Sequence, residues 1–452
     1  MENRGNRIIE DISQAKSAIA NRYCKNATDE MGNRRFMSNP RIANEQIQEA
    51  SYAFCREQVK GKRVLAIQDT TEINYQKHAG RLTKDDANLG PVGNNGDIGF
   101  FLHPVLVVEE ESGFPLGFSS IHEWNRDWEK ESKETRNYKK QAIEEKESFR
   151  WIASAEETKR QLKEAQHILV IGDRESDIYE EFARVPDAQC DVLVRCAQDR
   201  VLEDREETLF DYLASLPVAG EVEIEVKGNK NRAKRRAKME IRYSRVKIAR
   251  PANREKETLP PSVELSVIEI REKEESVPAG EEPIRWRLVT TLDVASVAEA
   301  CQCARWYSLR WWIEELFRVL KKQGLDLEGA QLESGLALKR LAIMALQAAL
   351  PIMQLTAARA GIWEVSPETV FTGEELEFQE QLLPHVEGRT QKQKNPYPRS
   401  NLAWSAWIIA RLGGWKTYYS STKPPGPITM KRGLERFYSQ FSGWCIASSS
   451  HT

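Results

Sequence analysis

The chain has 452 residues, of which 66 are Lys or Arg and 68 are Asp or Glu, so its net charge at pH 7 is −2. A nearly neutral chain shows no global preference for nucleic acid, and any surface for polyanions must therefore be local. The first residues lack an apolar export signal, and the most apolar run, residues 341–355, is interrupted by Gln347 and Pro351. We therefore expect a cytoplasmic protein of two to four folded units without a membrane span.

The cysteine pattern indicates free thiols. The sequence has 7 cysteines, an odd number, and the close pair Cys301 and Cys303 has no second pair at metal-binding spacing. This argues for a reducing compartment and against a zinc site.

The first half of the chain changes from helix to strand. Helices are predicted at 8–23 and 42–59, with a turn between them. From residue 63 an apolar strand pattern leads directly to Asp69, and two more strands are predicted at 100–110 and 113–124. We expect these three strands to form an antiparallel meander with Asp69 on the first. The alternative role for Asp69 is that of a turn residue.

A second acidic residue follows a later strand. The apolar run at 167–172 leads to Asp173 and then into a helical pattern, and a further short strand is predicted at 191–195. The junction between strand and helix in an open sheet is where ligands are usually held, and here it lacks the glycines of a phosphate-cradling loop. The alternative is that Asp173 caps the helix that begins at Arg174.

Residues 218–295 are predicted to form a separate β unit, because four segments there alternate or are rich in β-branched residues. The run 227–250 between and within these segments has eleven Lys or Arg and one acidic residue, Glu240. Such density predicts a local site for phosphates, and the alternative is a solvated loop. The residues that we assign to contacts with the DNA backbone are Lys234, Arg235 and Arg236.

Residues 306–325 are predicted to form a single helix with two faces. Four reactive side chains, spaced 3, 4 and 7 residues apart, lie within about 60° of one another around the helix axis. They are Tyr307, Arg310, Glu314 and Lys321. A separate apolar stripe contains Leu309, Ile313, Leu316, Phe317 and Leu320. The alternative is an ordinary amphipathic helix with charge pairs.

The last quarter of the chain is predicted to be helical. A second apolar helix is expected at 337–358, followed by an exposed basic run at 389–400. Four tryptophans are expected to build a small helical core, with a dimer contact as the alternative. They are Trp404, Trp407, Trp415 and Trp444.

Three acidic residues now stand out: Asp69 and Asp173 after strands, and Glu314 on a helix. Carboxylates are hard oxygen ligands, and three of them converging from different elements suit a pair of Mg²⁺ ions that bridge a phosphate. Arg310 could bind a phosphate through two N–H groups, and Lys321 could add a point charge.

Three blocks of the sequence carry a family resemblance. They are AIQDTTEINY around Asp69, VIGDRESDIYEEF around Asp173, and the pattern Y-x2-R-x3-E-x6-K that begins at Tyr307. Together they closely resemble the DDE cut-and-paste transposases of bacterial insertion sequences, in the insertion-sequence-four family that includes the kanamycin-resistance composite transposon. The resemblance runs from about residue 35 to the RLGGW segment at 411–415.

The resemblance implies an α/β fold with a ribonuclease H-like mixed-sheet core, a β insertion domain and helical N- and C-terminal regions. The implied domains are an N-terminal DNA-binding region at 1–55, the core at 56–217 and 296–360, the insertion at 218–295, and a C-terminal region for dimerisation at 361–452. Family members usually carry a longer N-terminal domain that recognises the terminal repeat, whereas 33 residues precede the RRFMSNP block here.

The resemblance also implies residue roles. Asp69, Asp173 and Glu314 would be the catalytic triad that holds two Mg²⁺ ions, for which Mn²⁺ could substitute. The DNA backbone near the cut would be contacted by Tyr307, Arg310 and Lys321. Trp286 would stack on a base flipped out of a DNA hairpin.

The implied activity is Mg²⁺-dependent excision of an insertion sequence through nicking, hairpin formation and resolution, followed by strand transfer. The implied partners are double-stranded DNA, both transposon ends and target, and a second copy of the chain in a synaptic homodimer at the nucleoid. One alternative is a non-catalytic, transposase-derived protein that binds DNA or dimerises and thereby inhibits transposition; another is a stand-alone structure-specific nuclease. The intact triad favours the enzyme, and the short N-terminal region favours the inhibitor.

Overall fold

The computed structural model describes residues 2–129, 141–226, 234–252, 259–416 and 423–449. The architecture is mixed α/β, as the sequence predicts, and the chain divides into two compact units. The first unit comprises Met1–Val59, Thr70–Lys130 and Trp312–Thr452, and the second comprises Lys60–Asp69 and Glu131–Trp311. Each unit is therefore assembled from segments that are far apart in the sequence.

The first unit is mainly helical. Its elements are α1 (Glu2–Ala15), α2 (Ala20–Tyr23), α3 (Ala27–Met37), α4 (Asn44–Val59), β2 (Thr71–Asn74), β3 (Gly90–Val92), α5 (Gly93–Gly96), β4 (Asp97–Glu109), β5 (Pro115–Trp124), α10 (Trp311–Leu320), α11 (Gly335–Ala358), α12 (Gly373–Val386), α13 (Leu402–Leu412) and α14 (Pro427–Ser449). Strands β2, β3 and β5 all pair antiparallel with β4. Asp69 itself lies just after a strand rather than on one, which corrects its expected place in a meander.

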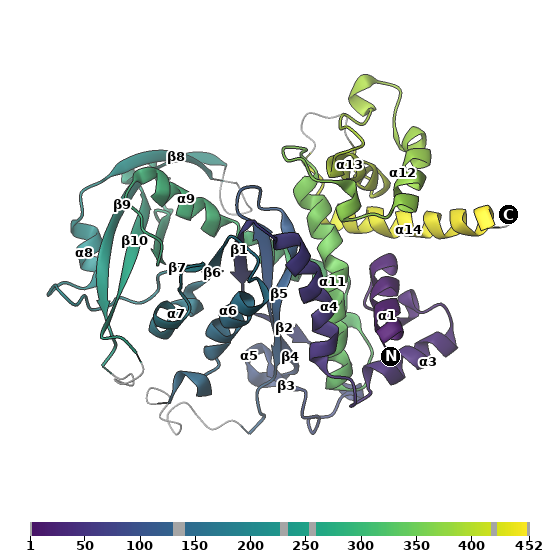
Figure 1. Ribbon diagram of the computed structural model, residues 1–452, viewed down its shortest axis with the longest axis horizontal. Coiled ribbons are helices and arrows are strands. Elements are labelled where there is room, and N and C mark those ends of the chain that lie inside the picture. The colour runs from purple at the N-terminus through teal and green to yellow at the C-terminus, as the bar shows by residue number, and fades with distance from the viewer. Residues whose placement is uncertain (1, 130–140, 227–233, 253–258, 417–422, 450–452) are drawn as a thin grey trace. The chain divides into compact units, whose positions relative to one another are not determined.

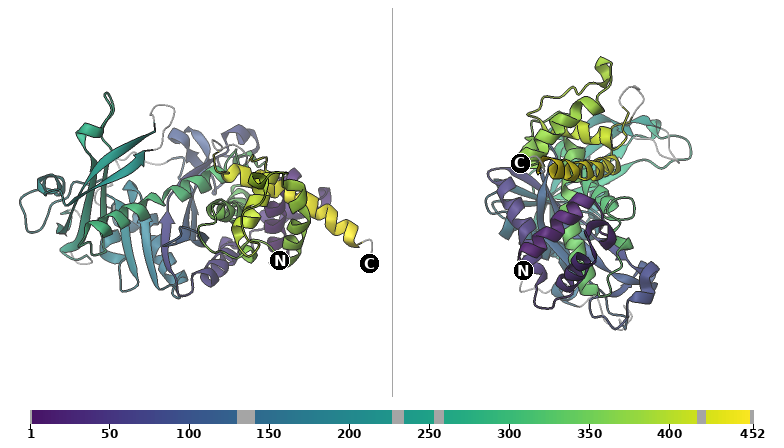
Figure 2. Two further views of the ribbon diagram at one scale, coloured as in Figure 1. Left: turned by 90° about the horizontal axis from the view of Figure 1, so that it is seen from above. Right: turned by 90° about the vertical axis from the view of Figure 1, so that its right-hand side faces the viewer.

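Helix α11 forms the core of the first unit. It begins where the Ser334 side chain accepts a hydrogen bond from the backbone N–H of Ala337, as expected for an N-cap. Helices α1, α4, α13 and α14 pack against it (Figure 2). By length and composition α11 could cross a membrane, but 83% of its most apolar window is buried inside the fold. Its apolar residues are therefore those of a core helix.

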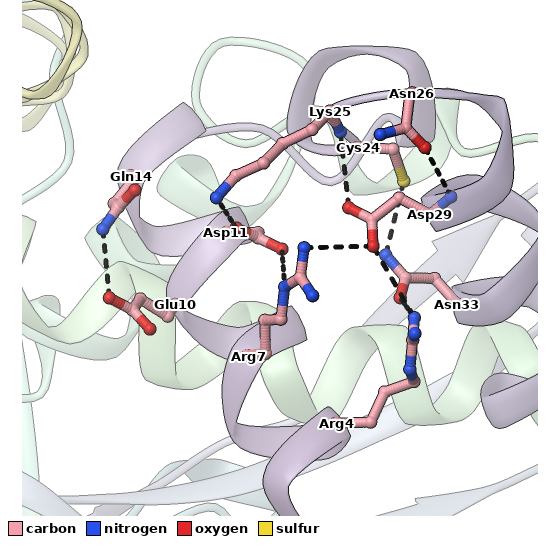
Figure 3. Close-up of polar contacts among 10 residues, drawn as sticks. All are labelled: Arg4, Arg7, Glu10, Asp11, Gln14, Cys24, Lys25, Asn26, Asp29 and Asn33. Atoms are coloured by element: carbon pink, nitrogen blue, oxygen red, sulfur yellow. Dashed lines mark hydrogen bonds and ion pairs between the residues drawn. The ribbon is translucent and has the colours of Figure 1, made fainter. Parts of the chain in front are cut away.

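The N-terminal helices are held together by an ion-pair network around Asp29 of α3 (Figure 3). The carboxylate of Asp29 lies 3.2 Å from Nη2 of Arg7 and 3.7 Å from Nη1 of Arg4, both on α1. Arg4 also donates to the side chain of Asn33 at 2.9 Å. Asp29 is buried. The network joins α1 to α3, and it engages Arg4 and Arg7 within the fold, although both lie in the region that is expected to bind DNA.

The N-terminal region contains more helices than the two that the sequence predicts. Helix α1 ends where Lys16 adopts a left-handed backbone with a φ of 46°, which terminates helices. The predicted turn before α4 is present, and Arg340 of α11 holds it by donating to the carbonyls of Met37 at 2.6 Å and Asn39 at 3.0 Å.

Three of the four C-terminal tryptophans pack within the first unit, as predicted, whereas Trp415 is only partly buried and its Nε1 donates to the carbonyl of Lys423 at 3.0 Å. Trp404 and Trp407 of α13 are buried. Trp444 of α14 stacks against Phe441 and also contacts Phe378 of α12. These contacts form an aromatic cluster between α12 and α14.

The second unit is built on one mixed sheet. Its elements are β1 (Arg63–Gln68), α6 (Phe149–Gln161), β6 (His167–Gly172), α7 (Tyr179–Arg184), β7 (Cys190–Arg195), α8 (Leu209–Ser215), β8 (Gly220–Val226), β9 (Arg235–Ala249), β10 (Ser262–Glu272), β11 (Arg285–Thr290) and α9 (Val297–Ser308). Strands β1, β6 and β7 are parallel neighbours and are almost entirely buried, as is usual for parallel strands covered on both faces.

The four strands predicted at 218–295 are present, but they do not form a separate sheet. Strand β11 pairs antiparallel with β7. The order continues through β10, β9 and β8, which Figure 1 labels. The insertion is therefore an extension of the sheet that carries β1 and β6. The pattern of single strands could not show this, because the pairing joins residues such as Val194 and Val289 that are distant in sequence.

The prediction of a single helix at 306–325 is wrong. Helix α9 ends at Ser308 and α10 begins at Trp311. The backbone N–H of Leu309 and of Arg310 donate to carbonyls three residues earlier, Trp306 and Tyr307, which tightens and ends the helix. The local sequence has no Gly or Pro that would break a helix, so tertiary contacts override its helical propensity.

Candidate functional site

Two carboxylates lie at the same edge of the sheet in the second unit. In the parallel pair of β1 and β6, Ile67 is opposite Ile171, and Asp69 and Asp173 each follow two residues later. The two acidic residues therefore extend the same row beyond the carboxyl ends of adjacent strands, the edge where ligands of open sheets bind. Both side chains are only partly buried.

Asp173 has the capping role that the sequence offers as an alternative. One carboxylate oxygen accepts a hydrogen bond from the backbone N–H of Glu175 at 2.7 Å and so caps the short helix η3 (Arg174–Ser176). A carboxylate has about four lone-pair sites, so this bond leaves capacity for a cation. The capping role explains how the side chain is held at the strand end.

Asp69 pairs with Arg310 from the signature. Nη1 of Arg310 donates to Oδ2 of Asp69 at 2.8 Å, and each side chain is 18% exposed. The two residues are distant in sequence but belong to the same unit. Arg310 lies in the break between α9 and α10, from which its guanidinium reaches the end of β1.

Tyr307 lies in the last turn of α9 and is buried. Burial raises the pKa of its phenol; Arg310 and Arg195 oppose this, and Asp173 adds to it. A raised pKa keeps the phenol protonated near neutral pH, so it can donate a hydrogen bond to an acceptor such as a phosphate oxygen. These influences also show that Tyr307, Arg310 and Asp173 lie in one neighbourhood.

Arg195 is a site residue that the sequence interpretation missed. Gly172 of β6 is opposite Val194 of β7, so Arg195 follows directly beside Asp173 in the same row. The signal in the sequence is the one that identified the two aspartates, a charged residue directly after an apolar run. The signal is weak here, because the run DVLVR is short.

Glu314 and Lys321 belong to the first unit. Glu314 lies in the first turn of α10, and the predicted apolar stripe of this helix, Ile313, Leu316, Phe317 and Leu320, is buried. Lys321 follows the helix, and its Nζ lies 3.9 Å from Oε1 of Glu328. The second unit thus brings together four of the predicted residues, namely Asp69, Asp173, Tyr307 and Arg310. It does not contain the Glu and Lys of the signature.

The carboxylates have the donor chemistry of a site for a hard divalent cation. Among the described residues, no three or more His, Cys, Asp or Glu side chains are arranged as a ready metal site. Asp69 and Asp173 nevertheless offer oxygen ligands from adjacent strand ends, which is the type that Mg²⁺ and Mn²⁺ prefer. In this structure the positive charge beside Asp69 is supplied by Arg310.

Trp286 lies on β11 opposite Ile270 of β10 and is partly buried. Its neighbours Arg285 and Arg287 point to the other face of the sheet, where both guanidinium groups approach the carboxylate of Glu269. This is the alternation expected of side chains along a strand.

The basic run is largely neutralised where the structure describes it. Residues 227–233 lie outside the described residues. Arg235, which the sequence assigns to DNA contact, is bound to the buried carboxylate of Glu272 by two hydrogen bonds and is 13% exposed. Lys234 pairs with Glu225 at 2.6 Å, and Arg236 lies 3.9 Å from Glu223. Glu223 and Glu225 lie on β8, and Glu272 lies on β10. A count of charges within residues 227–250 does not include them.

Part of the chain matches a known protein family. Residues 128–350 match the family model described as the transposase DDE domain. The matched range includes Asp173, Trp286 and the whole signature from Tyr307 to Lys321, but it begins after Asp69. This part of the chain is therefore similar to the DDE domain of transposases.

Proposed function

We propose that this chain is an active DNA transposase of the insertion-sequence-four type, which excises an insertion sequence and joins it to target DNA. The observation that carries this proposal is the row formed by Asp69 and Asp173 at adjacent strand ends, with Arg310 of the signature bound to Asp69. The match to the transposase DDE domain supports the same class. We assign the core to 56–217 and 296–360, with a ribonuclease H-like fold.

The triad of the proposal is Asp69, Asp173 and Glu314. These carboxylates would hold Mg²⁺ or Mn²⁺, which supplies charge stabilisation at the phosphate and activation of the attacking oxygen. Asp173 is held for this role by its bond to the N–H of Glu175. Asp69 would hold the cation with the carboxylate that Arg310 contacts in this structure.

The cationic and aromatic residues bind DNA. The guanidinium of Arg310, once released from Asp69, binds a backbone phosphate near the cut through two N–H groups, and Arg195 is placed to contact the same strand. The phenol of Tyr307 donates to a phosphate oxygen, and Lys321 adds charge. Trp286 offers its ring to a flipped base during hairpin formation. Lys234 and Arg236 contact the backbone farther from the cut.

Two copies of the chain would act together on two transposon ends, in the cytoplasm at the nucleoid. In this proposal residues 361–452 contribute to the dimer, and residues 1–55 bind the element's end.

A non-catalytic inhibitor of transposition is the second candidate. The observation that favours it is the network around Asp29, which commits Arg4 and Arg7 to contacts within the N-terminal region (Figure 3). Cations that are paired internally contribute less to DNA binding, so recognition of the element's end would be weak.

The test uses DNA from both sides of the coding sequence, so that it includes the element's ends. The purified protein is incubated with this DNA with and without Mg²⁺, and strand breaks are mapped on a denaturing gel. Mg²⁺-dependent breaks at both ends support the transposase. DNA binding without breaks under any divalent cation supports the inhibitor instead.

A further inference from the structure

A buried carboxyl group lies behind the two strand ends of the candidate site. Glu181 of α7 has no exposed surface, and Glu is rarely buried completely unless its oxygens are paired. Oε2 accepts a hydrogen bond from the hydroxyl of Ser176 at 2.6 Å, and Oε1 accepts one from the amide of Gln68 at 3.3 Å. The roles proposed above make no use of Glu181.

The two partners of Glu181 belong to the two segments that carry the aspartates. Gln68 is the last residue of β1 and directly precedes Asp69. Ser176 ends the short helix that Asp173 caps. Glu181 therefore links the end of β1 to the junction after β6 through side-chain hydrogen bonds, in addition to the pairing of the strands.

Gly172 provides the space that this link needs. A Cβ atom at Gly172 would lie 2.3 Å from Oγ and 2.4 Å from Cβ of Ser176, so a larger residue would displace Ser176. Gly172 is the last residue of β6, directly before Asp173. Its lack of a side chain allows Ser176 to approach the strand and to reach Glu181.

A carboxyl group is a costly choice if this position only needs to be filled. Burial raises the pKa of Glu181 to about 8; Asp177 and Asp173 add to the rise, and the hydrogen bonds from Ser176 and Gln68 oppose it. Removing a polar group from water costs free energy that an apolar side chain of similar volume would not incur. The two hydrogen bonds that Glu181 accepts therefore explain why a carboxyl group, and not an apolar side chain, lies at this position.

We propose that Glu181 is a positioning residue, which fixes the separation of Asp69 and Asp173 by holding Gln68 and Ser176 together. The inference rests on the proposed function, because it takes the two aspartates as ligands of a divalent cation. Residues that orient metal ligands commonly change metal affinity by about 10- to 100-fold when replaced. Glu181 acts through its neighbours and does not itself contact metal or DNA.

The test measures Mn²⁺ binding to the full chain by calorimetry, together with the midpoint of thermal unfolding. Glu181→Gln keeps the size of the side chain but replaces one oxygen, which can accept a hydrogen bond whether or not the carboxyl group is protonated, with an NH₂ group, which can only donate. It should raise the dissociation constant for Mn²⁺ at least about tenfold. Ser176→Ala removes one half of the link and keeps the carboxyl group, so it should weaken binding in the same direction. Ser176→Ala therefore tests the same link by Mn²⁺ affinity if Glu181→Gln folds poorly.

Glu272→Gln is the matched control, because Glu272 is also a buried carboxylate of the second unit but is bound to Arg235. It should lower the unfolding midpoint and leave Mn²⁺ affinity at the parental value. Equal losses of affinity in Glu272→Gln and Glu181→Gln would overturn the inference, since the effect would then be general destabilisation. Parental affinity in Glu181→Gln, with binding lost in Asp69→Ala, would overturn the inference and leave the proposed function intact. Absence of any Mn²⁺ binding that depends on Asp69 and Asp173 in the parental protein would refute the proposed function itself.

Discussion

At the scale of single residues, the partner of a charge decides what the charge can do. Arg235 and Arg236 are neighbours in a basic run, yet Arg235 is bound to the buried Glu272, whereas the side chain of Arg236 is 82% exposed. Strand alternation explains the difference, since successive side chains point to opposite faces of β9. The two arginines should therefore respond differently to the same substitution.

Arg235→Ala should destabilise the protein by about 1 to 3 kcal/mol, because it leaves the buried carboxylate of Glu272 without its charged partner. The measurement is the free energy of unfolding in urea. Arg236→Ala is the control and should change stability by less than about 0.5 kcal/mol, since its ion pair is exposed. A loss of DNA affinity in Arg235→Ala without loss of stability would contradict this account of Arg235.

Glu181 should make stability depend on pH. Its folded-state pKa of about 8 lies above the ordinary value of 4.5, so between these values the folded state binds the proton more tightly than the unfolded state. The contribution of this group to stability is fully present below pH 4.5 and is lost as pH rises towards 8. The slope is at most about 1.4 kcal/mol per pH unit.

This dependence is measured by urea unfolding of the parental protein and of Glu181→Gln at pH 5, 6, 7 and 8. Because glutamine does not titrate, the stability of Glu181→Gln relative to the parent should increase steadily over this range. Asp173 and Asp177, the charged groups that influence Glu181, are unchanged in the variant. Parallel profiles for the two proteins would mean that Glu181 does not titrate in this window.

At the scale of elements, the exposure of β11 fits a stacking role for Trp286. The ring lies on the face opposite to Arg285 and Arg287 and is partly open to solvent. Flipping a base out of a bent DNA end costs a few kcal/mol, and stacking on an aromatic ring returns about 1 to 3 kcal/mol per base. Hairpin formation should therefore depend on this ring more than the first nick does.

Trp286→Ala should nick transposon ends at close to the parental rate, accumulate nicked DNA and form little hairpin. The products are separated on denaturing gels over a time course. Arg285→Ala, a change on the opposite face of the same strand, is the control and should form hairpins at the parental rate. If Trp286→Ala also forms hairpins at the parental rate, then this residue does not stack on the base.

The sequence predicts those elements whose signal is local. Each apolar run that ends in an aspartate forms a strand with the acidic residue at its carboxyl end, and the apolar stripe of α10 is buried. The break at Leu309 and Arg310 has no local signal, since it accompanies a contact with Asp69, which is far away in the sequence. The same holds for the pairing of β11 with β7 and for the glutamates that neutralise the basic run.

At the scale of the whole molecule, the chain passes between its two units at the residues of the candidate site. The second unit's first segment ends at Asp69, and its second segment ends at Trp311, directly after Arg310 and three residues before Glu314. The two aspartates and the signature arginine thus belong to one unit, and the signature glutamate begins the return to the other. The central claim is that the carboxylates of Asp69, Asp173 and Glu314 serve one reaction.

That claim is tested most directly by measuring DNA cleavage and DNA binding side by side in Asp69→Ala, Asp173→Ala and Glu314→Ala. The substrate is the DNA that carries the element's ends, cleavage is followed with Mg²⁺, and binding is followed by gel shift at the same salt concentration. The account predicts that each substitution abolishes cleavage and leaves binding close to the parental level. Cleavage by Glu314→Ala at close to the parental rate would contradict it.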